Sequence, residues 1–173
     1  MKCHGFKGGI GSSSRIVKYE NKQYTVGVLV NSNFGSSNGK DLIFKGRRLG
    51  EEIKNYDILV LPGGMPGSTN LRDNERVIEL IREFNSNKKL VCAICAGPIA
   101  LGKAGITEGR NVTCYPGFED QLGKCNYKDD LIVVDENIIT GRGPAAAIPF
   151  AFEILSKISE EKANKVKKAM LFE

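Results

Sequence analysis

The chain has 173 residues, of which 41% are hydrophobic and 26% charged, proportions typical of a globular protein with a buried core. No apolar run approaches the roughly 20 residues that cross a bilayer, and no secretory signal pattern opens the sequence, so we expect a cytoplasmic protein with no membrane partner. The net charge of +5 comes largely from scattered lysines without interleaved aromatic residues, so a nucleic-acid partner is not expected. Five cysteines and a single histidine, His4, form neither a disulfide framework nor a zinc pattern, and we predict no metal and no cofactor.

Residues 1–52 differ in character from the rest and are interpreted as an atypical N-terminal segment of a single domain spanning residues 1–173. Residues 7–14 are rich in glycine and serine, which favours a loop, and a flexible connector is preferred over an anion-binding loop. Residues 24–30 are β-branched and aromatic, which predicts a strand, and residues 41–44 are expected to form a short second strand.

From residue 56 onward, the pattern alternates between strands and helices. Residues 57–61 and 90–94 are apolar runs expected of strands buried on both faces, and residues 74–84 carry apolar side chains at helical spacing. The remaining expected strands are residues 111–114, 131–134 and 137–140, and the remaining expected helices begin near residue 96 and cover residues 145–158 and 160–172. This alternation predicts a doubly wound α/β fold, a parallel sheet with helices on both faces, in which the strands of Leu59 and Val91 are adjacent and central.

Cys95 is the candidate nucleophile. It lies where the predicted strand 90–94 turns directly into a helix, with small residues after it that allow strand and helix to approach closely. This is the requirement of a nucleophile elbow, which lifts one strained residue above the sheet edge. The positive end of the following helix favours the thiolate there.

Two other interpretations of this cysteine are weighed against the nucleophile. Cys92 and Cys95 form a C-x-x-C pair that could be redox-active or bind a metal, or both could be core thiols. Side chains three residues apart in a strand point to opposite faces, so Cys92 should be packed while Cys95 emerges at the turn. A second C-x-x-C for a zinc site is absent from the sequence.

The backbone around Cys95 predicts an anion-binding site. In doubly wound sheets, ligands bind beyond the carboxyl ends of the strands, and two sharp turns, residues 62–64 and 94–96, follow such ends. If those strands are neighbours, the N–H groups of Gly64 and Ala96 converge beside the Cys95 sulfur. Convergent donors next to a nucleophile form an oxyanion hole.

Four segments together resemble the DJ-1/PfpI superfamily over about residues 50–158. They are Tyr-Asp-Ile-Leu-Val-Leu-Pro-Gly-Gly at 56–64, Ala-Ile-Cys-Ala-Gly-Pro at 93–98, Val-Thr-Cys-Tyr-Pro-Gly at 112–117 and Thr-Gly-Arg-Gly-Pro at 140–144. The resemblance implies a flavodoxin-like fold, a homodimer and a reactive cysteine at Cys95, with Tyr115 and Arg142 as supporting residues. It also implies a cofactor-free glyoxalase or deglycase acting on small aldehydes or glycated substrates, or an oxidation sensor or chaperone.

The sequence departs from the family pattern at the cysteine's partner. In the family, a protonated glutamate in the turn after the first strand hydrogen-bonds the thiolate, whereas here the strand 24–30 is followed by Asn31. Tyr115 stands where some members have a histidine. We therefore expect weakened turnover unless Glu20, Glu51 or Glu52 takes the glutamate's place.

Residues 3–15 and 24–35 resemble a segment of DmpA-type aminopeptidases, N-terminal-nucleophile hydrolases that cleave themselves before a serine. Their cleavage site does not follow, so that activity is not expected here. Three functions consequently stay open: a Cys95-dependent enzyme, an oxidation sensor or chaperone without turnover, and an inactive fusion with an aminopeptidase fragment. The carboxylates that the enzyme would need as acid or base, such as Glu108, Glu119 and Asp120, are interpreted as solvated surface groups.

Overall fold

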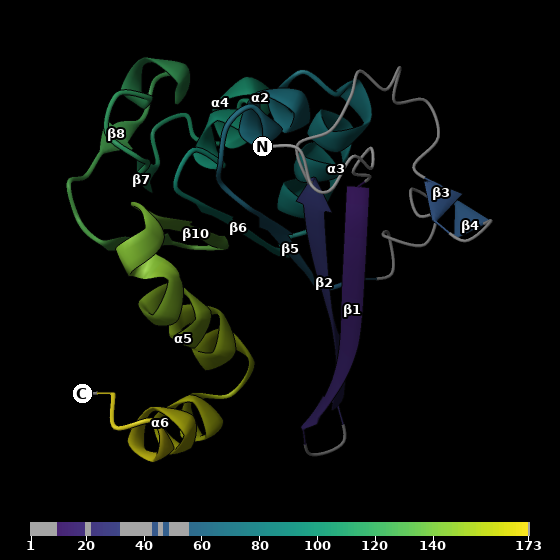
Figure 1. The fold of residues 1–173 in the computed structure, drawn as a ribbon, viewed down its shortest axis with the longest axis vertical. Helices are drawn as coiled ribbons and strands as arrows, with labels where there is room; N and C mark the ends of the chain where they lie inside the picture. The colour runs from purple at the N-terminus through teal and green to yellow at the C-terminus, as the bar shows by residue number, and fades with distance from the viewer. Residues whose placement is uncertain (1–9, 20–21, 32–42, 45–46, 49–55, 173) are drawn as a thin grey trace, which may run out of the picture.

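The computed structural model describes residues 10–19, 22–31, 43–44, 47–48 and 56–172 (Figure 1). Its main sheet has six strands in the order β1-β2-β5-β6-β10-β9. Their bounds are Ile10–Tyr19 for β1, Lys22–Asn31 for β2, Ile58–Leu61 for β5, Leu90–Ile94 for β6, Ile138–Gly141 for β10 and Ile132–Asp135 for β9. The four inner strands run parallel, and β1 and β9 pair antiparallel at the two edges. The predicted neighbours β5 and β6 are the two central strands, as expected.

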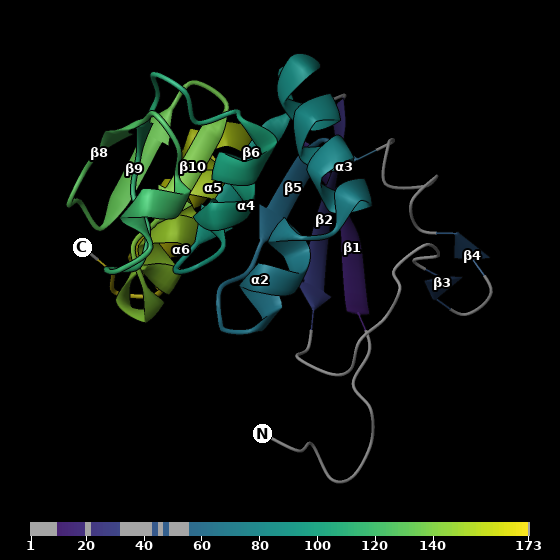
Figure 2. The same ribbon diagram turned by 90° about the horizontal axis from the view of Figure 1, so that it is seen from above.

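Helices cover both faces of this sheet (Figure 2). One face carries α2 (Gly67–Arg72), α3 (Glu75–Ser86) and α4 (Pro98–Ala104), and the other carries α5 (Ala147–Ile158), on which α6 (Glu160–Ala169) packs. The side chains of β6 divide between them, because Val91 lies in the core cluster of the first face and Cys92 in that of the second. The doubly wound, flavodoxin-like α/β fold predicted from the alternating pattern is confirmed.

Helix α3 shows why the sequence forms these elements. The Asn74 side chain caps it by accepting a hydrogen bond from the Val77 N–H at 3.1 Å, and Glu75 lies in the first turn, where a negative charge is favourable. Its buried side chains recur at helical spacing and are Val77, Ile78, Leu80, Ile81 and Phe84. The helix predicted at residues 74–84 is confirmed.

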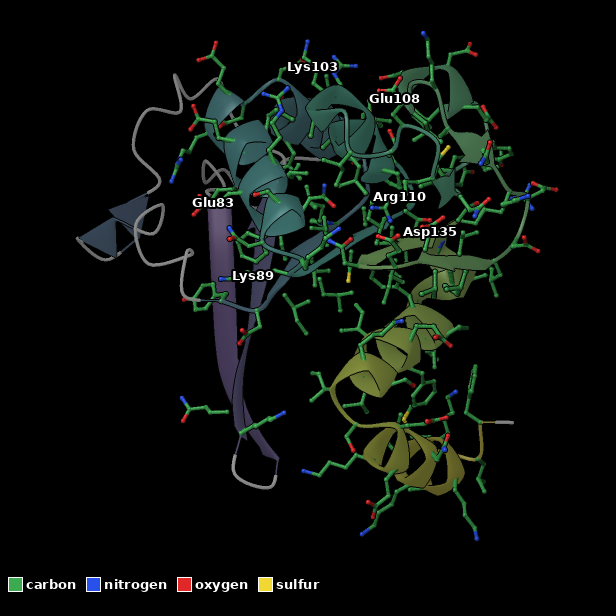
Figure 3. The ribbon with its side chains drawn as sticks, turned by 180° about the vertical axis from the view of Figure 1, so that it is seen from behind. Glu83, Lys89, Lys103, Glu108, Arg110 and Asp135 are labelled. Carbon is green, nitrogen blue, oxygen red and sulfur yellow. The ribbon has the colours of Figure 1, made fainter. Side chains whose placement is uncertain are left out.

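The smaller elements lie outside the six-stranded sheet. They are the strands β3 (Ile43–Phe44), β4 (Arg47–Arg48), β7 (Asn111–Val112) and β8 (Asn126–Tyr127) and the 3-10 helices η2 (Glu119–Gln121) and η3 (Pro144–Ala146). An ion pair joins β9 to the segment before β7, with Arg110 Nη1 3.1 Å from Asp135 Oδ1 (Figure 3). Within the described ranges, no helix has the length and apolar character needed to cross a bilayer.

Several boundaries differ from the prediction, among them that of the strand expected at residues 111–114, which ends at Val112. The loop expected at residues 7–14 is wrong for residues 10–14, which lie in β1. Pairing with β2 satisfies the backbone hydrogen-bonding groups of these residues, whatever their side chains are. Residues 7–9 lie outside the described part. The helix after Cys95 begins at Pro98, two residues later than expected. The last helix ends at Ala169 rather than at residue 172, because Leu171 adopts a left-handed φ of 55° that no helix continues through.

Candidate functional site

Cys95 occupies a strained turn between β6 and α4. Its φ is +62°, in the left-handed region that residues other than glycine seldom enter. The turn is tight, since the Gly97 N–H donates to the Ile94 carbonyl oxygen at 2.9 Å and α4 begins at the next residue. Such strain costs on the order of 1–3 kcal/mol and persists only where surrounding structure imposes it. Cys95 therefore lies on the sharp, strained turn that a nucleophile elbow requires, and its role as a nucleophile stays a prediction.

Two hydrogen bonds hold the peptide groups of Cys95. Its N–H donates to the Gly141 carbonyl oxygen at the end of β10 at 2.7 Å, and its carbonyl oxygen accepts the Tyr115 N–H at 2.9 Å. Both partners come from segments distant in sequence, so the elbow depends on the assembled sheet. This fixation lets the strained conformation persist.

Glycines beside the elbow allow its close approach to the neighbouring turn. The register of β5 and β6 pairs Leu61 with Ala93, so the two following turns leave the sheet together. A Cβ added to Gly63 would lie 2.5 Å from the Cys95 Cβ and 3.1 Å from its Sγ, and one added to Gly97 would lie 2.9 Å from the Leu61 carbonyl oxygen. Only hydrogen fits at either position.

The two predicted oxyanion donors, Gly64 and Ala96, lie on these adjoining turns. Within the part of the chain that the structure describes, neither N–H has a hydrogen-bond acceptor. Gly64 takes a φ of +89°, and its carbonyl oxygen is engaged by the N–H and the hydroxyl of Ser68 at 2.9 and 3.1 Å. The N–H groups of both residues are thus available, and their role in holding an oxyanion stays a prediction.

Burial separates Cys95 from two of the three other described cysteines. Cys95 is half-buried, whereas Cys92 and Cys114 are fully buried. Burial raises the pKa of Cys92, raises that of Cys114 to about 12 and also raises that of the half-buried Cys125. The expectation that Cys92 is packed and Cys95 emerges is confirmed, and no group of candidate metal ligands is found among the described residues.

The two supporting residues lie on the segments that anchor Cys95. Tyr115 is 44% exposed, and its ring lies over Gly143, where an added Cβ would be 3.4 Å from the Tyr115 Cδ2. Arg142 directly follows Gly141, and its guanidinium pairs with the Asp129 carboxylate and donates to the Asp129 carbonyl oxygen at 3.3 Å. Tyr115 and Arg142 therefore both lie on segments that contact the Cys95 backbone, and the Arg142 side chain is already paired with Asp129.

The described carboxylates do not supply the family's protonated glutamate. None of them is hydrogen-bonded to Cys95. Backbone N–H groups, its own and that of Gly117, lower the pKa of Glu119, whereas an acid protonated at neutral pH needs the opposite shift. Glu20, Glu51 and Glu52, the predicted replacements, lie outside the described residues.

Three residues that hold the site were missed from the sequence. They are Gly63, which contacts Cys95, Gly141, which accepts its N–H, and Thr140, whose Oγ1 accepts the Thr113 N–H at 2.9 Å and so ties the segment leading to Tyr115 onto β10. The repeated glycine after β5 was a signal for the first. The roles of Gly141 and Thr140 depend on β10 lying beside β6, and the local sequence does not predict that pairing.

The DJ-1/PfpI family model matches residues 18–157, and the chain belongs to this family. Protein DJ-1alpha of Drosophila melanogaster is 41% identical over 120 residues, which are 68% of this chain and 55% of that protein. The glutathione-independent glyoxalase DJR-1.2 of Caenorhabditis elegans is 34% identical over 146 residues, 79% of this chain and 77% of that protein. The crystal structure of Drosophila melanogaster DJ-1beta matches with a TM-score of 0.67 at 36% identity and covers 72% of this chain and 69% of that one.

The family match extends further towards the N-terminus than the sequence analysis expected. It begins at residue 18 and so includes β2, most of which lies in the segment that resembles aminopeptidases. The chain nevertheless spans only 55% of the length of Drosophila DJ-1alpha and 64% of that of Drosophila dj-1beta. The resemblance of residues 1–50 to aminopeptidases gains no support from these matches.

Proposed function

We propose that the protein is a cysteine-dependent enzyme that acts on small reactive aldehydes or glycated substrates. The observation that carries this proposal is the half-buried Cys95 at φ +62°, held between Gly141 and Tyr115. A name among the relatives, the Caenorhabditis elegans glyoxalase, points to the same substrate class. The half-buried thiol on this strained turn is where a carbonyl substrate would approach.

The proposed chemistry begins with attack of the Cys95 thiolate on the aldehyde carbon. A bond forms between Sγ and that carbon, and the carbonyl π electrons move to the oxygen, which becomes an oxyanion. The free N–H groups of Gly64 and Ala96 stabilise that charge. Later proton transfers need an acid or base, and because no described carboxylate contacts Cys95, turnover is expected to be slow.

The proposal is tested by methylglyoxal consumption in three proteins: the wild type, Cys95→Ser and Cys125→Ser. Cys125 is a fair control because it is also half-buried but is not part of the turn between β6 and α4. We expect slow consumption in the wild type and in Cys125→Ser, and none above background in Cys95→Ser. Equal rates in all three proteins would reject the proposal.

A second candidate function is an oxidation sensor or a chaperone without turnover. The lack of a carboxylate partner at Cys95 among the described residues favours it, because oxidation of a thiolate needs no general acid. Mild peroxide followed by mass spectrometry separates the two: stoichiometric sulfinic acid at Cys95 in a protein without methylglyoxal turnover supports the sensor. An inactive fusion would show neither property.

The proposal also covers the oligomeric state of the protein, its domain organisation and its location. We expect one domain spanning residues 1–173, with 1–52 as its atypical segment, a two-fold homodimer as is common for proteins of this size, and a cytoplasmic location. Light scattering tests the dimer directly. A monomer mass of 18.9 kDa across micromolar concentrations would contradict it.

A further inference from the structure

Tyr115 is an exposed aromatic residue whose backbone is bound to the elbow. Its N–H donates to the Cys95 carbonyl oxygen at 2.9 Å, yet the residue is 44% exposed. A tyrosine ring that stays in contact with water keeps apolar surface that a ligand can cover, and burying that surface is favourable. Tyr115 is therefore a candidate contact for a ligand that reaches Cys95.

The Tyr115 ring lies over the chain that continues β10, the strand next to the elbow. β10 pairs in parallel with β6, with Gly141 opposite Ile94, and neighbouring strands lie about 4.8 Å apart (Figure 1). Gly143 is two residues beyond Gly141, and a Cβ added there would be 3.4 Å from the Tyr115 Cδ2 and 3.7 Å from its Cε2. A substituent that extends from Cys95 towards the β10 side therefore meets this ring.

Phe118 holds the Tyr115 ring in place. The Phe118 N–H donates to the Tyr115 carbonyl oxygen at 3.3 Å, and the two ring centroids are 6.5 Å apart with the rings tilted by 60°. Phe118 in turn packs against the core cluster of this face of the sheet. Tilted rings at this separation attract each other, and a further aromatic group gains from the same kind of contact. The Tyr115 ring is thus anchored on one side without being buried.

The charges on the same segments disfavour an anionic ligand. Arg142, which lies between Gly141 and Gly143, is paired with the Asp129 carboxylate. Glu119 follows Tyr115 by four residues, and its own backbone N–H and that of Gly117 lower its pKa, so its carboxylate is ionised at neutral pH. An uncharged aromatic group avoids repulsion by these carboxylates and still covers the ring.

We propose that Tyr115 is a specificity residue that selects uncharged aldehydes with an aromatic substituent, such as phenylglyoxal, over methylglyoxal. The substituent of a carbonyl compound attached to the Cys95 sulfur packs on the Tyr115 ring, and a phenyl group covers more of that ring than a methyl group does. The ring itself takes no part in bond formation. This inference rests on the proposed function, because it names the substrate class of the same Cys95 site.

Alkylation of Cys95 tests the contact without requiring turnover. Phenacyl bromide and bromoacetone both form a bond between the sulfur and a CH₂ carbon and release bromide, and they differ as phenylglyoxal and methylglyoxal do, by phenyl in place of methyl. Peptide mass spectrometry gives the ratio of the two rates at Cys95, and the same ratio for N-acetylcysteine in solution corrects for intrinsic reactivity. We expect the corrected ratio to be about three- to tenfold in favour of phenacyl bromide, as one aromatic pair supplies.

Variants at Tyr115 make the alkylation test specific. Tyr115→Ala should bring the corrected ratio close to one, Tyr115→Leu should lower it because the ring is lost, and Tyr115→Phe should keep it. Val134→Ala, at a 38% exposed position on β9, is the control and should behave as the wild type. Circular dichroism verifies that each variant is folded. A wild-type ratio of one, or a ratio that neither Tyr115→Ala nor Tyr115→Leu changes, would overturn the proposal.

Consumption of phenylglyoxal and methylglyoxal by the same proteins separates this inference from the proposed function. We expect a higher kcat/KM for phenylglyoxal in the wild type, a preference that Tyr115→Phe keeps and Tyr115→Ala loses. Consumption of neither aldehyde, with the alkylation preference intact, would reject the proposed enzyme while the Tyr115 contact stands. Consumption of both aldehydes without a preference that depends on Tyr115 would reject the role of Tyr115 and leave the enzyme in place.

Discussion

Gly63 lies so close to Cys95 that a single added carbon would collide with it. An ideal Cβ at Gly63 would be 2.5 Å from the Cys95 Cβ and 2.8 Å from the Ile94 carbonyl oxygen, separations that real Cβ atoms do not show. Neither obstacle is the flexible end of a long side chain. The position of Cys95 is therefore set in part by the absence of a side chain on the neighbouring turn.

Gly63→Ala should destabilise the fold and disturb the elbow. Overpacking of this kind costs about 1–3 kcal/mol, which urea unfolding measures. Gly143→Ala is the control, because its Cβ would meet the Tyr115 ring at an ordinary 3.4 Å and its φ of −171° suits any residue. If the two variants lose the same stability, the close approach at Gly63 is not what fixes Cys95.

Cys95 should be alkylated fastest of the described cysteines near pH 7. Burial raises the pKa of Cys114 to about 12 and raises that of Cys92 too, so both stay protonated and shielded in the folded protein. Iodoacetamide labelling followed by peptide mass spectrometry measures the order. Labelling of Cys125 at the rate of Cys95, in a folded Cys95→Ala variant, would show that exposure alone governs reactivity.

Asp135 should stabilise the protein in a pH-dependent way. Its carboxylate accepts the Asn111 N–H at 2.8 Å and pairs with Arg110, and these contacts lower its pKa below the ordinary 3.8. Because the folded pKa is depressed, the contribution is complete above the unfolded pKa and is lost as the pH falls through the folded pKa.

Asp135→Asn should therefore lower the free energy of unfolding at pH 7 by about 1–3 kcal/mol. The difference from wild type should narrow as the pH falls below about 4. Urea unfolding across this range measures it, with the exposed Asp130→Asn as the control variant. A difference that stays constant with pH would mean that packing, not charge, is lost.

Thr140→Val should loosen the segment that anchors Cys95. The buried Thr140 hydroxyl oxygen accepts the Thr113 N–H, and removing it leaves a buried donor unsatisfied at a cost of about 1–3 kcal/mol. Thr140→Ser keeps the oxygen and should retain more of both stability and Cys95 alkylation rate. If Thr140→Val and Thr140→Ser show the same stability and the same Cys95 alkylation rate, the hydrogen bond does not contribute to either.

The sequence predicts the central layers well because local patterns determine them. The apolar runs at 57–61 and 90–94 had to be buried on both faces, and the structure places β5 and β6 at the centre. The spacing of small residues after Cys95 likewise predicted a turn that the φ of +62° confirms. In each case, the determining information lies within one short segment.

The features that the sequence does not predict depend mainly on which strands pair with each other, and a short segment does not encode its pairing partner. Residues 10–14 look like a loop by composition but form the edge strand β1, because β2 supplies the backbone partners. The Gly141 carbonyl that accepts the Cys95 N–H becomes a neighbour only when β10 pairs beside β6. Leu171 ends the last helix early, although its apolar character resembles that of a helix continuing to residue 172.

The most direct test of the central claim is to measure methylglyoxal turnover and the Cys95 alkylation rate in the same preparations of wild type and Cys95→Ser. We expect the strained turn to keep the thiol reactive, whereas no described carboxylate is hydrogen-bonded to Cys95 to move protons, so alkylation and turnover should separate. We predict rapid alkylation at Cys95 in the wild type, with turnover about 10²–10⁴-fold below that of a relative that carries the glutamate, and no turnover in Cys95→Ser. Turnover that persists in Cys95→Ser would contradict the claim that Cys95 is the nucleophile.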